Sequence, residues 1–130
     1  MKLDTFVIYL AAGFFIAYGI VFMLAPVAMS GLVTGSAPEG VSAMVDFRAT
    51  YGGMTLAVGL AILYLHRATH TRASLVLVAM LLSCMALGRV IGLIVDGSGN
   101  VLMYVYLVLE IAGSALALLA MKNQSGPEAH

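Results

Sequence analysis

The feature that most constrains the fold is a single arginine placed inside an otherwise apolar run. The run extends from Leu75 to Asp96 and carries Arg89. It is long enough to cross the hydrocarbon core of a bilayer, which takes about 20 residues. A guanidinium at membrane depth is costly unless it meets an opposite charge, polar groups or water. We therefore expect the rest of the chain to provide partners for Arg89.

Three further apolar runs have a similar length. Hydrophobic residues make up 62% of the chain and charged residues 9%, whereas a typical soluble domain carries about 25% charged residues. The sequence thus predicts an all-α, integral membrane four-helix bundle with up-down-up-down topology. The predicted spans are residues 5–25, 45–65, 73–95 and 101–121. We expect residues 1–122 to form one transmembrane domain and residues 123–130 to form a flexible polar tail.

The positively charged residues predict the orientation. If the four spans alternate, the N-terminus, the second connection and the C-terminus share one side. That side carries Lys2, Arg67, Arg72 and Lys122, whereas the connections on the other side carry Glu39 and Asp96. The positive-inside rule then places both termini in the cytoplasm. The formal net charge is zero, which argues against a nucleic-acid partner.

The connections and the glycines predict how the helices meet. The segment 26–40 mixes glycine and proline with apolar residues, so we expect an interfacial segment with one short helical turn. It would be either an ordinary loop or a lid over the bundle. The turn formers at 96–100 predict that the third and fourth helices are antiparallel neighbours. Small residues predict close helix contacts at Gly13, at Gly88 with Gly92, and at the glycines on the Arg48 face.

Depth in the membrane predicts the first ion pair. Counted from Thr71 at 1.5 Å per residue, Arg89 lies about 27 Å along its helix, in the outer third of the bilayer. Glu110 lies about four residues deeper on the fourth span, a difference of about 6 Å that an arginine side chain can bridge. We predict an Arg89–Glu110 pair, with Tyr106 one helical turn above Glu110.

The start of the second span adds further charges. In an ideal α-helix Arg48 and Tyr51 share one face, and Asp46 would cap the start of the helix. Arg48, closer to the surface, would then meet Asp46 or Asp96. Two arginines and three carboxylates leave a formal charge of −1. One carboxylate could therefore hold a proton at neutral pH, and the deepest, Glu110, is the candidate.

Charges inside a membrane span are a functional signal. We therefore predict an outward-facing ionic pocket that binds or transports a lipid-like or amphipathic small molecule. Its candidate ligand-binding residues are Arg48, Tyr51, Arg89, Tyr106, Glu110, Asp46 and Asp96. Membrane lipids, such an amphipathic ligand and further copies of the chain are the expected partners.

Two alternatives stay open. The protein could be a membrane-embedded, lipid-modifying enzyme with Glu110 as acid or base. It could instead be a structural or partner subunit whose ion pairs only fix assembly. His66 and His70 stand four residues apart but lack a third ligand, so we expect a solvated cytoplasmic turn there rather than a metal site. The sequence points to no catalytic nucleophile and no cofactor.

The chain resembles a bacterial family of small four-span membrane proteins, known as domain of unknown function 4345. The resemblance rests on Tyr18-Gly19, the run DFRATYGG at residues 46–53, Gly88-Arg89 and Glu110. It implies a helical bundle that is a multi-pass protein of the bacterial inner membrane. It implies no activity.

Overall fold

The structure, a computed structural model, describes residues 2–124, and their regular structure is helical. The elements are α1 (Leu3–Leu24), α2 (Pro26–Thr34), α3 (Val41–Phe47), the π-helical segment η1 (Arg48–Met54), α4 (Thr55–Arg67), α5 (Thr71–Val95) and α6 (Val101–Gln124). α3, η1 and α4 join into one continuous rod, Val41–Arg67. Within the described residues, four helices are long and apolar enough to span a membrane: α1, this rod, α5 and α6. The predicted all-helical fold with four spans is confirmed.

Several predicted boundaries shift. The second span begins at Val41 rather than near residue 45, and α6 continues to Gln124, which takes in the first two residues of the predicted tail. Residues 125–130 lie outside the described part. α1 ends at Leu24, and Pro26 opens α2, a first-turn position that proline tolerates because its missing N–H has no helical partner there. The segment after Pro26 thus holds a nine-residue helix rather than one turn.

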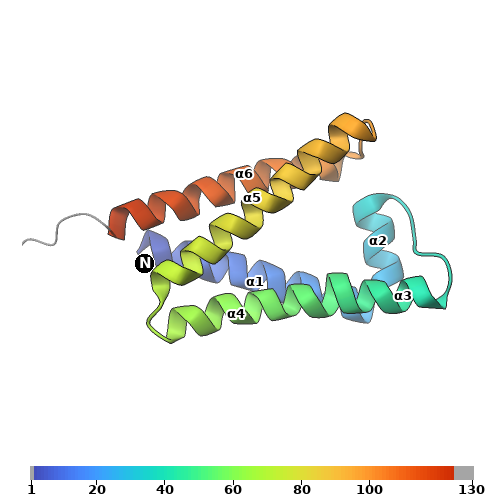
Figure 1. The fold of residues 1–130 in the computed structure, drawn as a ribbon. Coiled ribbons are helices and arrows are strands. Elements are labelled where there is room, and N and C mark those ends of the chain that lie inside the picture. Colours follow the sequence, from blue (N-terminus) through green and yellow to red (C-terminus); the bar gives the residue numbers. More distant parts are fainter. Residues whose placement is uncertain (1, 125–130) are drawn as a thin grey trace, which may run out of the picture.

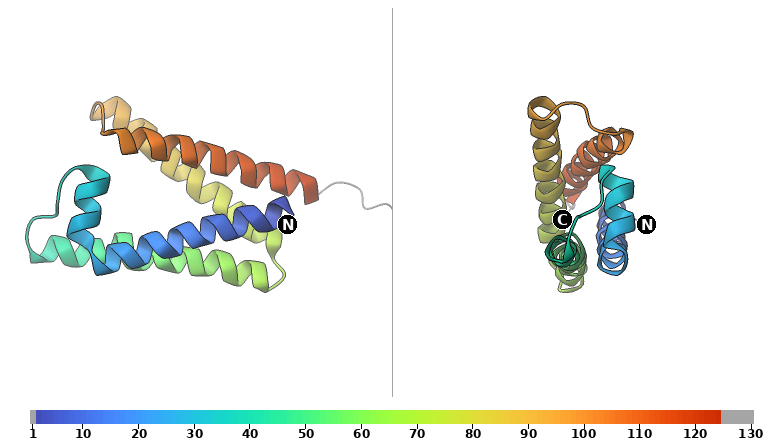
Figure 2. Two further views of the ribbon diagram at one scale, coloured as in Figure 1. Left: turned by 180° about the vertical axis from the view of Figure 1, so that it is seen from behind. Right: turned by 90° about the vertical axis from the view of Figure 1, so that its right-hand side faces the viewer.

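The long helices form two pairs. α1 packs along the rod, and α5 packs along α6. The pairs converge at the end that carries the N-terminus and diverge toward the α5–α6 turn (Figures 1 and 2). At the converging end the Gln124 side-chain amide donates to a carboxylate oxygen of Asp4, 2.9 Å away. α2 stands across the diverging end (Figure 1).

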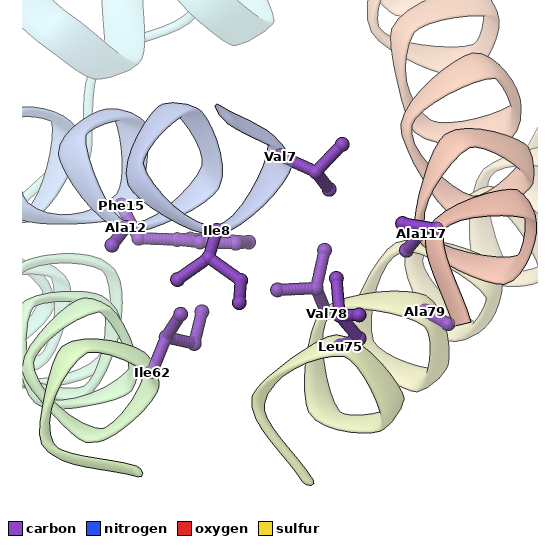
Figure 3. Close-up of a cluster of buried hydrophobic side chains, with 10 residues drawn as sticks. Val7, Ile8, Ala12, Phe15, Ile62, Leu75, Val78, Ala79 and Ala117 are labelled. Carbon is purple, nitrogen blue, oxygen red and sulfur yellow. The ribbon is translucent and has the colours of Figure 1, made fainter. Parts of the chain in front are cut away.

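The apolar core fills the converging half of the bundle. It takes side chains from α1, α4, α5 and α6 (Figure 3). Its buried members are Val7, Ile8, Ala12, Phe15, Ile62, Leu75, Val78, Ala79, Ala117 and Ala120. Beside it, the Ser74 hydroxyl donates to the carbonyl of Ile62 at 2.9 Å, which ties the start of α5 to α4. Apolar burial therefore holds the helices together at this end, while the other end is left to different interactions.

Glycines allow α1 to touch the rod backbone to backbone. A Cβ added at Gly19 would lie 2.5 Å from the backbone nitrogen of Leu56, and one at Gly59 would lie 2.9 Å from the carbonyl of Ala12. Real Cβ atoms do not approach backbone so closely, so both positions require glycine. The predicted glycine contact on the second span is confirmed.

The other two glycine predictions are wrong. A Cβ built at Gly13 or at Gly88 meets nothing within 4 Å, and one at Gly92 meets only the side chain of Asp96 on its own helix. A small residue permits a close approach but does not require one, so sequence alone could not tell these glycines from Gly19.

We predict that Gly19→Ala destabilises the protein and Gly13→Ala does not. Overpacking costs about 1–3 kcal/mol, and the upper part of that range applies because the methyl group would meet backbone atoms. Thermal unfolding in a mild detergent should show a clear drop in Tm for Gly19→Ala only. Gly13→Ala should leave Tm unchanged or raise it, since alanine favours a helix by about 1 kcal/mol over glycine. Equal losses in both variants would contradict the close contact of α1 and the rod.

Candidate functional site

An arginine–glutamate pair joins α5 to α6 in the diverging half of the bundle. The Nε of Arg89 donates to Oε2 of Glu110 at 3.0 Å, and Nη2 donates to Oε1 at 2.6 Å. This two-point geometry is the stronger form of an ion pair, and it suits an ionised carboxylate. The Glu110 side chain is 5% exposed and that of Arg89 18% exposed. The predicted Arg89–Glu110 pair is present, and part of the Arg89 side chain stays exposed.

The surroundings of Arg89 combine aromatic and sulfur groups. Its guanidinium carbon lies 5.3 Å from the centre of the Tyr106 ring, a cation–π distance. Its Nη1 donates to the sulfur of Met103 at 3.1 Å. Tyr18 of α1 interacts electrostatically with both Arg89 and Tyr106. The ion pair on α5 and α6 therefore faces α1 across the diverging half.

A continuous chain of aromatic rings lies on the α1 side. Neighbouring ring centres are 4.9–5.5 Å apart, and two of the contacts are stacked, as aromatic pairs prefer. In order, the chain is Phe14, Tyr18, Phe22, Tyr51 and Phe47. It runs from α1 to the outer part of the rod, so Tyr51 joins the site through Phe22. The sequence predicts Tyr51 as a candidate ligand-binding residue but does not predict its contacts with these aromatic rings.

Arg48 does not pair with a carboxylate, so the prediction of an Arg48–Asp46 or Arg48–Asp96 pair is wrong. Its Nη1 donates to the carbonyl of Met23, and the carbonyl of Leu24 lies 3.5 Å away. These carbonyls stand at the C-terminal end of α1, where helix carbonyls lack helical partners. A cation is also favoured there by the helix dipole. Backbone carbonyls at a helix end carry no residue signature, so the pattern of charged residues did not indicate this partner.

Asp46 and Asp96 stand apart from the ion pair. The helix begins at Val41, so Asp46 lies inside it and cannot be its N-cap; its carboxylate accepts from the Thr50 hydroxyl at 3.4 Å. Asp96 is exposed at the C-terminal end of α5, beside Gly92 of the same helix. The structure therefore brings Arg89, Glu110 and Tyr106 together, and aromatic rings link Tyr51 to them. Arg48, Asp46 and Asp96 lie outside this group, nearer the rim of the diverging half.

The π-helical segment η1 explains part of this rearrangement. In a π-helix the backbone bonds run from residue i to i+5, so each turn holds more residues than an α-helical turn. The face predicted at 100° per residue is therefore not kept across Arg48–Met54. In this wide turn, Tyr51 stacks on Phe22 while Arg48 reaches the end of α1. Such segments are common at functional sites.

Asn100 links α2 to the opposite pair of helices. Its side-chain amide donates to the carbonyl of Val33 at 2.9 Å, and its side-chain oxygen accepts from the backbone N–H of Met103 at 3.2 Å. The Asn100 side chain thus bonds both to the first turn of α6 and to the last turn of α2, and it connects the two helices across the diverging end. The sequence had indicated Asn100 only as a turn residue.

The surface hollows lie elsewhere. One is lined by Tyr104, Val105, Val108 and Leu109 of α6. A second lies between α5 and α6 and includes Ser83 and Ser114, whose hydroxyls are 2.7 Å apart. Neither is lined by Arg89 or Glu110. The ion pair is thus a partly exposed site between diverging helices, distinct from both hollows.

The fold and the site define a class of protein. Four helices of membrane-spanning length, with an ion pair at membrane depth, indicate a small multi-pass membrane protein. The chain belongs to the family described as Domain of unknown function (DUF4345), whose sequence profile matches residues 3–121. No curated protein and no solved structure matches the chain.

We predict strong coupling between Arg89 and Glu110 in a double-mutant cycle. Breaking a buried pair by removing one partner costs about 3–5 kcal/mol, because the other charge is left uncompensated. Arg89→Leu and Glu110→Leu should each lower stability in mixed-micelle unfolding, and the double variant should be more stable than the two single losses predict. Additive losses would mean that the two side chains do not interact.

Proposed function

We propose that this protein binds, and carries within the membrane, a lipid-like or amphipathic small molecule whose polar end meets the Arg89–Glu110 pair. The observation that carries the proposal is the placement of this pair. It joins α5 to α6 in the diverging half of the bundle, and the Arg89 side chain is 18% exposed. Glu110 is almost fully buried, whereas the Arg89 side chain keeps some exposed surface, so the pair can join α5 to α6 and still meet a ligand at Arg89.

The two halves of the bundle suit a one-sided ligand site. Apolar side chains from all four long helices close the converging half. The diverging half offers the ion pair on α5 and α6, and the aromatic chain on α1 and the rod. A polar head at Arg89 with an apolar tail along Tyr18 and the exposed ring of Phe14 would match this division. Polar groups that fix orientation within a mostly apolar lining are typical of small-molecule sites.

Catalysis by Glu110 has weaker support. Both oxygens of the carboxylate accept N–H groups of Arg89. A general base must reach the proton that it abstracts, and here the guanidinium occupies both oxygens. Binding is therefore the function that the geometry supports best.

We further propose a bacterial inner-membrane location with both termini in the cytoplasm. The location rests on the family resemblance. The orientation rests on Lys2, Arg67, Arg72 and Lys122, which all belong to the converging end, because the cytoplasmic side of membrane proteins is enriched in positive charge. In this orientation the diverging half faces the exterior.

The proposed function predicts that the purified protein retains amphipathic molecules through the ion pair. Native mass spectrometry after gentle extraction should show bound lipid on the wild-type protein. The double variant Arg89→Leu/Glu110→Leu should lose most of it, about tenfold, because the polar anchor is gone while no single charge is left uncompensated.

Ser83→Ala is the matched control for that experiment. It removes a hydroxyl from the hollow between α5 and α6, away from the ion pair, and should retain lipid as the wild type does. Equal retention by the wild type, the control and the double variant would reject the proposed site and favour a purely structural role.

The orientation predicts opposite labelling of two single cysteines. In a Cys84→Ala background, Ser98→Cys in the α5–α6 turn should react with a membrane-impermeant maleimide in intact spheroplasts. His70→Cys in the α4–α5 turn should react only after the membrane is opened. The reverse pattern would place the diverging half in the cytoplasm.

A further inference from the structure

We propose that the site selects a net-neutral lipid with an oxygen acceptor in its head group, and that Glu110 determines this selectivity. The inference rests on the proposed function and names the ligand class of the same site. Three features support it: the charge balance around Arg89, the charges at the rim of the diverging half, and the weakly bonded Nη1 donor of Arg89.

The charge of Arg89 is already compensated. Both Glu110 oxygens accept from the guanidinium at 3.0 and 2.6 Å. An anionic head group that approached Arg89 would therefore also approach the Glu110 carboxylate. In a poorly polarisable membrane interior, like charges at such range repel strongly. An arginine alone would attract anions, but this arginine–glutamate pair presents no net charge to a ligand.

The rim of the diverging half is acidic. Asp46 and Asp96 are exposed, and so is Glu39 in the segment that connects α2 to α3. The positive charge at this rim, Arg48, is directed to the carbonyls at the end of α1. Negative clefts lower the local concentration of anions and raise that of cations. The route to the ion pair thus disfavours anionic lipids before they reach it.

One donor of Arg89 has a poor partner. Nη1 donates to the thioether sulfur of Met103 at 3.1 Å, and such a sulfur is a weak acceptor. The Tyr106 ring lies over one face of the guanidinium, and a hydrogen-bond acceptor meets the N–H groups at the edge. An ester, phosphoryl or hydroxyl oxygen would be a better acceptor there, and the flexible Met103 side chain could move aside.

These three observations define one ligand class. The head group carries an oxygen acceptor for Nη1 of Arg89 and has no net charge. A zwitterionic phospholipid fits, with its phosphoryl oxygen toward Arg89 and its ammonium group toward the acidic rim. Selectivity then comes mainly from rejecting the anionic competitor.

The test is a competition between two lipids with identical acyl chains. The full-length protein is placed in nanodiscs of equal phosphatidylethanolamine, which is zwitterionic, and phosphatidylglycerol, which is anionic. The lipids retained after release from the disc are quantified by native mass spectrometry. The wild type should retain phosphatidylethanolamine over phosphatidylglycerol by about fivefold or more.

Substitution at Glu110 should change this ratio. Glu110→Gln keeps the size of the side chain and one acceptor but leaves Arg89 uncompensated, so the ratio should shift toward phosphatidylglycerol by about tenfold. Asp4→Asn removes the same formal charge at the converging end, away from both the ion pair and the acidic rim, and should move the ratio by less than about twofold.

Each outcome has a distinct meaning. A wild type that prefers phosphatidylglycerol overturns the inference while the proposed function stands, and this comparison needs no substitution. A folded Glu110→Gln protein with an unchanged ratio also overturns it, because Glu110 would not set the preference. If neither lipid is retained above the level of Arg89→Leu/Glu110→Leu, the proposed function itself fails.

Discussion

The structure depends on an arginine that cannot be left alone in a membrane. Arg89 meets Glu110 through two hydrogen bonds, and this requirement sets which faces of α5 and α6 meet in the diverging half. Ordinary side-chain packing can slide along a helix by a turn at modest cost, whereas a buried charge pair cannot. The pair thus fixes the register of two helices and at the same time places a polar group at membrane depth.

A second constraint acts at the opposite side of the bundle. α1 touches the rod through Gly19 and Gly59, and the apolar core ties both to α5 and α6 at the converging end. Small residues and close van der Waals contact are the usual means of association inside lipid, where no hydrophobic force acts between helices. Because the apolar core is confined to the converging half, the α5–α6 pair can diverge from α1 and the rod in the other half without loss of the fold.

Much of the fold and the centre of the site could be predicted from the sequence. The length and polarity of the apolar runs indicate four spans, and helix rise brings Glu110 within reach of the Arg89 side chain. The partners of Arg48 could not be predicted, because they are the backbone carbonyls of Met23 and Leu24 rather than charged side chains. Nor could the role of Asp46, because the helix begins at Val41 and then widens at η1.

The wide turn at η1 has a mechanical consequence. If the seven residues of η1 adopted α-helical geometry, α3 would rotate relative to α4 by roughly 100° about the helix axis. This is the angle that one residue spans in an α-helix. That rotation would carry the Arg48 guanidinium away from the end of α1 and unstack Tyr51 from Phe22. The width of η1 therefore determines whether the outermost part of the rod stays in contact with α1.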